Sequence, residues 1–174
     1  MGAWFYYGTL RDADLFRIVA NAEMGTLDTR PGHVSGYRAV RVADETYPGL
    51  LAQDHAAVEG LYAPDVPPWI EARIGFYEED EYHCAPIEVR LDDGSRVWAN
   101  VFMPNPQAAL TGESWWLDSW REHDKQTALR LAAAWMSLFG QGDPERLHDA
   151  WEALKLSLAA NDTPSAIETA RVAG

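Results

Sequence analysis

Two short segments of the chain hold residue types that could carry out chemistry. The first is a turn, Tyr7-Gly8-Thr9-Leu10, which follows an aromatic run and precedes a helical pattern. A glycine loop in this place lets successive backbone N–H groups point outward, and such a nest near a helix N-terminus binds a carboxylate or a phosphate. On these four residues alone, an ordinary strand-to-helix turn is the favoured interpretation.

The second segment is an acidic run that begins at Glu78. Residues 71–93 hold eight acids and two arginines, and most of these acids are expected to be solvated. Phe76-Tyr77 before the run and Tyr82 after it would give one of the acids an apolar wall. A partly desolvated carboxylate has a raised pKa and can act as a general base. The residues do not say which acid this is.

Other common reaction centres lack support in the sequence. The five histidines form no H-x-x-x-H pair, and the single cysteine, Cys84, offers no thiolate cluster, so a zinc site is not expected. We expect Cys84 to be a small buried hydrophobic residue rather than a nucleophile. The chain also lacks a G-x-S-x-G elbow, a Walker sequence and a G-x-G-x-x-G loop.

The overall composition is that of a globular protein with a strong acidic balance. The 174 residues include 14 Lys and Arg against 27 Asp and Glu, for a net charge of −13. Nucleic acid and anionic membranes need a basic face, so neither is expected as a partner. No apolar run is long enough to span a membrane, and no signal peptide is visible at the start. A lone cysteine fits a reducing compartment, which predicts a cytoplasmic location.

Local patterns predict the elements that must position the two segments. The run from Trp4 to Tyr7 predicts a buried strand that ends at Gly8, and apolar residues at helical spacing predict a helix over 12–23. Asp93-Gly94 predicts a hairpin in which both turn residues take positive φ, with Pro86 at an edge, a bulge or a strand start. The other elements expected before residue 107 are strands over 34–42 and 57–62, turns at 29–32 and 47–49, and a short helix after Pro67.

The pattern changes to helices near residue 107. Apolar stripes at helical spacing run over 128–139 and 147–158. We therefore predict a boundary that separates residues 1–107 from a helical extension over 108–174. This extension contains five tryptophans: Trp115, Trp116, Trp120, Trp135 and Trp151. They could pack on the rest of the chain or form a surface for a partner protein. We favour packing on the rest of the chain.

Several short segments, in this order, resemble the γ-glutamylcyclotransferase family, in particular its AIG2-like branch. The resemblance spans roughly residues 4–103 and rests on Tyr7-Gly8-Thr9-Leu10, Gly36-Tyr37, Tyr47-Pro48-Gly49-Leu50, Val58-Glu59-Gly60, and Tyr77-Glu78 with Tyr82. It implies an α+β fold, a small mixed β-barrel flanked by helices, which we assign to residues 1–107. The resemblance does not cover the helical tail, and the apolar stripes predict that the extension over 108–174 packs on the barrel.

The resemblance also implies a reaction. The loop of Tyr7, Gly8, Thr9 and Leu10, together with Tyr82, would bind a γ-glutamyl amide or dipeptide, and Glu78 would be the general base. The substrate's own amine would attack its γ-carbonyl, giving 5-oxoproline and a free amine or amino acid, with no metal or organic cofactor. The family's glutathione-specific branch has an arginine-glycine-threonine segment ahead of its proline-glycine, and residues 43–48 lack it. This favours a γ-glutamyl substrate other than glutathione.

Two alternatives remain open at this point. A glycine often follows the family's glutamate, whereas this chain has Glu79, so Glu79 is the alternative base. The same barrel could also be a non-catalytic module that binds a small carboxylate ligand. The leaving amine and the oligomeric state are not predicted.

Overall fold

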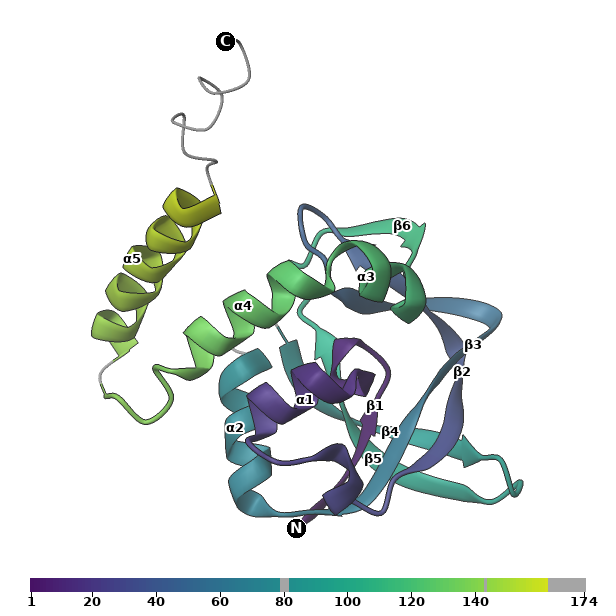
Figure 1. The fold of residues 1–174 in the computed structure, drawn as a ribbon. Coiled ribbons are helices and arrows are strands. Elements are labelled where there is room, and N and C mark those ends of the chain that lie inside the picture. The colour runs from purple at the N-terminus through teal and green to yellow at the C-terminus, as the bar shows by residue number, and fades with distance from the viewer. Residues whose placement is uncertain (79–81, 143, 163–174) are drawn as a thin grey trace, which may run out of the picture. The chain divides into compact units, whose positions relative to one another are not determined.

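The computed structural model describes residues 1–78, 82–142 and 144–162 (Figure 1). Contacts between Cα atoms divide the chain into two units, Met1–Met136 and Ser137–Gly174. The described part of the second unit contains the helix α5 (Pro144–Asp162), on which Lys155 lies over the Trp151 ring at 5.5 Å. Whether residues 1–107 fold without the later helices stays a prediction.

The first unit is built on a closed mixed β-barrel, as the resemblance implies. Within the described residues five strands close the barrel, and the sixth, β6 (Leu110–Ser114), pairs with the outside of one of them. The five are β1 (Gly2–Tyr6), β2 (Arg30–Val42), β3 (Pro48–Val66), β4 (Tyr82–Leu91) and β5 (Arg96–Pro104). The strand β1 runs parallel to β5 and antiparallel to β3, and pairing of β2 with β3 closes the ring.

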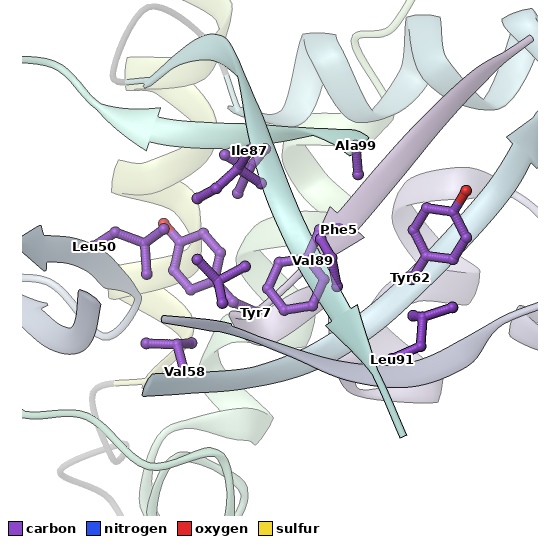
Figure 2. Close-up of a cluster of buried hydrophobic side chains, with 11 residues drawn as sticks. Phe5, Tyr7, Leu50, Val58, Tyr62, Ile87, Val89, Leu91 and Ala99 are labelled. Carbon is purple, nitrogen blue, oxygen red and sulfur yellow. The ribbon is translucent and has the colours of Figure 1, made fainter. Parts of the chain in front are cut away.

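The core of the barrel consists of inward-facing side chains from all five strands (Figure 2). Alternation on β4 places Ile87, Val89 and Leu91 inside, because side chains two residues apart share a face of a strand. Full burial of each large aliphatic side chain stabilises the fold by about 1.5–3 kcal/mol. The buried members are Phe5, Tyr7, Val34, Leu50, Val58, Tyr62, Ile87, Val89, Leu91, Ala99 and Val101.

One glycine allows β1 to lie close against β3. A Cβ atom on Gly60 would collide with the Phe5 ring and with the backbone oxygen of Tyr6. Only glycine therefore lets the end of β1 reach this position. Since the Tyr7-Gly8 turn follows directly, Gly60 also sets where that turn lies.

The predicted hairpin forms, with a different turn. Strands β4 and β5 pair antiparallel from Tyr82 to Arg90. Of the two predicted turn residues, Asp93 and Gly94, only Gly94 has a positive φ, of 84°. The Gly94 N–H donates to Leu91 O at 2.9 Å, and the Asp93 carboxylate accepts from the Ser95 N–H at 2.8 Å. A longer loop with one left-handed residue thus replaces the two-residue turn. Pro86 lies, as predicted, where β4 has a single partner strand.

Two predicted turns are wrong, because pairing with distant strands overrides their local composition. Residues 29–32 were expected to turn, yet β2 begins at Arg30, and Pro31 pairs with Leu61 near the start of the strand, where a missing N–H is tolerated. The turn at 47–49 is also shifted. Strand β3 begins at Pro48, and the reversal occurs before it, where Asp44 has a φ of 63°.

The expectation for Cys84 is also wrong, because its side chain is exposed. Cys84 shares its face of β4 with Glu88 and Arg90, whereas the inward residues have odd numbers. Burial of part of the thiol, with the nearby Glu71 carboxylate, raises the pKa of Cys84. Cys84 is therefore not an activated nucleophile.

Four α-helices in the first unit cover the barrel in the described residues: α1 (Ala13–Ala20), α2 (Pro68–Glu78), α3 (Leu117–His123) and α4 (Lys125–Met136). The predicted helices near 12–23 and after Pro67 are confirmed. Trp120 and Trp115 are buried and Trp135 stacks on Phe76 at 4.7 Å, whereas Trp116 is 69% exposed. Three of these tryptophans therefore pack within the first unit, and packing of the whole helical extension on the barrel stays a prediction.

Candidate functional site

The Tyr7-Gly8 turn is held at its far end by a buried carboxylate. Asp12 caps α1 by accepting from the Asp14 N–H at 3.1 Å and the Leu15 N–H at 3.4 Å. It also accepts from Arg121 Nε on α3 at 3.0 Å and pairs with Lys125 Nζ on α4 at 3.0 Å. Burial opposes ionisation, but the hydrogen bonds from Lys125, Arg121 and Leu15 outweigh it and lower the pKa of Asp12.

Between β1 and Asp12, residues 9–11 form the short 3₁₀ turn η1 (Thr9–Arg11). Its hydrogen bonds begin with the Arg11 N–H, which donates to Gly8 O at 3.2 Å. The N–H groups of Thr9 and Leu10 precede this first bond, so the turn itself supplies them with no acceptor. Residues 8–11 therefore form a strand-to-helix turn with two early amides, in which Thr9 and Leu10 are 8% and 4% exposed, and anion binding by this turn stays a prediction.

Gly8 lies directly against the start of β3. A Cβ atom on Gly8 would come within 3.1 Å of Pro48 Cγ. This contact is tighter than a side chain normally makes, so the turn favours glycine for close approach to Pro48. The Tyr-Pro-Gly-Leu segment and the Tyr-Gly-Thr-Leu segment, 40 residues apart in sequence, are thus neighbours in the fold.

The carbonyl oxygen of Pro48 brings two tyrosines together. Tyr82 Oη donates to Pro48 O at 2.9 Å, and Tyr7 Oη lies 3.4 Å from the same oxygen and 3.1 Å from Phe102 O. The Tyr47 and Tyr82 rings lie 6.2 Å apart between centroids. Two of the predicted site residues, Tyr7 on the turn and Tyr82 on β4, therefore share one backbone acceptor.

Glu78 is the last residue of α2 and is half-buried. Burial raises the pKa of Tyr6 and of Tyr7, and in each case the Glu78 carboxylate raises it further. An effect of this kind requires that Glu78 lie near both phenols. Glu78 therefore acts electrostatically on Tyr6 at the end of β1 and on Tyr7 after it, and its place in a catalytic site stays a prediction.

Some parts of the sequence-based picture change or fall outside the structure. Glu79, the alternative base, and the acids at 80 and 81 lie outside the described residues. The Phe76 ring stacks on Trp135, and whether Phe76 also forms an apolar wall for one of the acids stays a prediction. Sequence reasoning missed Tyr6, whose hydroxyl is buried, because it was one aromatic residue in an apolar run.

A separate hollow of about 320 Å³ lies at the other end of β4, where β2 and β4 separate. Its lining includes His33, Arg90 and Arg96, and none of the predicted site residues. Among the residues that the structure describes, no three His, Cys, Asp or Glu side chains gather in a way that could hold a metal ion. Within the same residues, no helix has the length and apolar character that a membrane span requires.

Comparison with known proteins agrees with the barrel and with the order of its motifs. The model of the family described as "Gamma-glutamyl cyclotransferase, AIG2-like" matches residues 4–122. The chain belongs to this family. The match continues past the last strand into α3, so it covers the barrel together with the Arg121 contact to Asp12.

Solved structures show the same γ-glutamyl cyclotransferase-like fold. One is a solution structure of an Arabidopsis thaliana protein, with 20% identity and a TM-score of 0.55, over 72% of this chain and 76% of that one. A second Arabidopsis thaliana solution structure has 19% identity and a TM-score of 0.56, over 72% of this chain and 84% of that one. No curated protein matches the chain.

Proposed function

We propose that this chain converts a γ-glutamyl amide or dipeptide into 5-oxoproline and a free amine or amino acid, with Glu78 as the general base. The observation that carries the proposal is the electrostatic effect of Glu78 on Tyr7, the residue that opens the Gly8 turn. A carboxylate and a row of early backbone amides are the groups that a γ-glutamyl head needs. The family supplies the class of reaction.

In the proposed complex, the turn at Gly8 binds the charged end of the substrate. The N–H groups of Thr9 and Leu10 are the donors for the α-carboxylate, since the 3₁₀ turn leaves them without an acceptor of its own. Tyr7 and Tyr82 hold Pro48 in place and so fix the wall that Gly8 contacts. Few other groups are needed, because the nucleophile and the electrophile belong to one molecule and must only be folded together.

Glu78 then takes a proton from the substrate's α-ammonium group. The free amine attacks the γ-carbonyl carbon, a C–N bond of the five-membered lactam forms, and the C–N bond to the leaving amine breaks. Overall, two protons pass from the attacking to the leaving nitrogen, and no water is consumed. A free glutamate has a pKa of about 4.3 and an α-amine one of about 7.7–8.0, so the surroundings of Glu78 must narrow this gap.

The test is Glu78→Gln, with Glu71→Gln as the matched control. Both acids lie on α2 and both act on Tyr6, but Glu71 accepts a hydrogen bond from Trp4 Nε1 at 2.8 Å, and glutamine can accept it too. With γ-glutamylalanine and γ-glutamylmethylamide as probes, Glu78→Gln should release 5-oxoproline about 10²–10⁴-fold more slowly at unchanged melting temperature. The Glu71→Gln rate should stay within a few-fold of the starting protein.

Two outcomes would contradict the proposal. Equal 5-oxoproline release by the Glu78→Gln variant would remove Glu78 from the role of base. Binding of these probes in calorimetry without any turnover, across a panel that includes glutathione, would favour the non-catalytic binding module instead. Turnover of glutathione above the other probes would overturn the expected substrate preference alone.

A further inference from the structure

Tyr6 has a feature that the proposed reaction does not use. Its side chain is 3% exposed, and its hydroxyl oxygen is buried with no hydrogen-bond partner. The ring packs edge-on against Phe16 of α1, at 6.1 Å between centroids, on the face of β1 that points away from the Tyr7 side chain. A buried hydroxyl without an acceptor is costly, so a tyrosine here, rather than phenylalanine, calls for an acceptor in some functional state.

Two carboxylates of α2 lie near this hydroxyl. Burial raises the pKa of Tyr6, and Glu71 and then Glu78 raise it further, so the phenol keeps its proton and remains a donor. Glu71 and Glu78 are seven residues apart, about two helical turns, and therefore lie on the same side of α2.

The order along the strand matches the order along the helix. Trp4 Nε1, one step earlier on this face of β1, already donates to Glu71 at 2.8 Å. Tyr6 follows Trp4 toward the Gly8 turn, as Glu78 follows Glu71 toward the end of α2. Glu78 is thus the next acid of α2 beyond Glu71, which Trp4 already contacts, and Figure 1 shows α2 beside α1.

We propose that Tyr6 is a positioning residue for the Glu78 base, and that its hydroxyl donates a hydrogen bond to the Glu78 carboxylate in the substrate complex. This inference rests on the proposed function. Catalytic hydrogen bonds are often long or poorly aligned without substrate and shorten when it binds. The bond would aim the carboxylate at the substrate's ammonium group. It would also favour the charged form of the carboxylate, so the smaller pKa difference that the proposed reaction needs has to come from burial of Glu78 and not from this bond.

Other titratable groups lie around the pair. The described titratable groups that act on Tyr6 or are acted on by Glu78 are Glu71 on α2 and Tyr7 directly after β1, and Tyr82 on β4 shares the Pro48 acceptor with Tyr7. Helix α1 presents the apolar Phe16 ring. Burial and Glu78 raise the pKa of Tyr7, so this phenol stays protonated through an ordinary assay range.

The experiment compares Tyr6→Phe with Tyr62→Phe by the pH dependence of kcat for γ-glutamylalanine. Tyr62 is a matched control because it is also buried in the barrel, with its ring 5.4 Å from the Arg30 guanidinium carbon. Loss of a donor to the charged base raises the pKa of the base, so the acidic limb should move up by about one pH unit in Tyr6→Phe. Its plateau kcat should fall about tenfold with little change in KM. The limb of Tyr62→Phe should not move.

A second variant makes the test independent of lost packing. Incorporation of 3-fluorotyrosine at position 6 keeps the ring and gives a stronger donor, so the acidic limb should move downward. Unchanged limbs in both Tyr6 variants, with folding intact, would overturn the positioning role. If the starting protein itself releases no 5-oxoproline, the proposed function has failed instead, and the two failures are distinguishable.

Discussion

Two acids, Asp12 and Glu78, differ in the groups that surround their carboxylates. Asp12 follows the turn and has 3% of its side chain exposed, with Arg121 and Lys125 both at 3.0 Å. Glu78 ends α2 and lies near the phenols of Tyr6 and Tyr7. The two cations stabilise the charged form of Asp12. Phenols, in contrast, can donate hydrogen bonds to Glu78 and bring no positive charge to it.

The difference separates a structural acid from one suited to proton transfer. A carboxylate with a lowered pKa and two cationic partners is a poor base, because it holds its charge too firmly. Asp12 instead ties α1, α3 and α4 together behind the turn. Three predictions test this contrast, beginning with the largest expected effect.

Removing the structural acid should destabilise the fold strongly. Asp12→Ala removes the N-cap of α1 and leaves Arg121 and Lys125 without their buried partner. Because both cations are partly exposed, we expect a loss of about 3 kcal/mol in the free energy of unfolding by urea, below the upper range for a fully buried pair. Asp118→Asn is the matched control, because Asp118 also pairs with Arg121 but its side chain is 93% exposed. This variant should change the free energy of unfolding by less than about 0.5 kcal/mol.

Acid pH should weaken the contribution of Asp12 to the stability of the fold. The lowered pKa of Asp12 means that its stabilising effect is present above the unfolded value of about 3.9 and is lost as the pH falls through the folded value. The difference in unfolding free energy between the starting protein and Asp12→Ala should therefore shrink as the pH falls from neutral toward 3. A difference that stays constant or grows would contradict the assignment of a charged, paired Asp12.

The two tyrosines at Pro48 should give the smallest effects. Tyr82→Phe and Tyr7→Phe each remove one hydroxyl from Pro48 O, at 2.9 Å and 3.4 Å. We expect each to lose about 1 kcal/mol of stability and to raise KM for γ-glutamylalanine several-fold, because the wall behind Gly8 loosens. Tyr7→Phe should cost more, since Tyr7 Oη also contacts Phe102 O at 3.1 Å. Unchanged KM in both variants would show that this wall does not position the substrate.

Local patterns were informative where an element depends on its own residues. Alternation over 87–91 and the periodicity after Asp12 predicted β4 and α1. The turn at 29–32 and the burial of Cys84 were misjudged, because strand pairing and the register of β4 decide them. A one-residue change in register moves a side chain to the other face of a strand, and nothing local to Cys84 fixes that register.

The amino-acid sequence by itself determined the residue types at the site, the Tyr-Gly-Thr-Leu turn and the family resemblance that picks out Glu78. Only the tertiary structure decided which residues meet there: Pro48 with Tyr7 and Tyr82, and Asp12 with Arg121 and Lys125. The physical reason is that closing the barrel joins strands and helices far apart in sequence, and a carboxylate's chemistry depends on the groups brought around it.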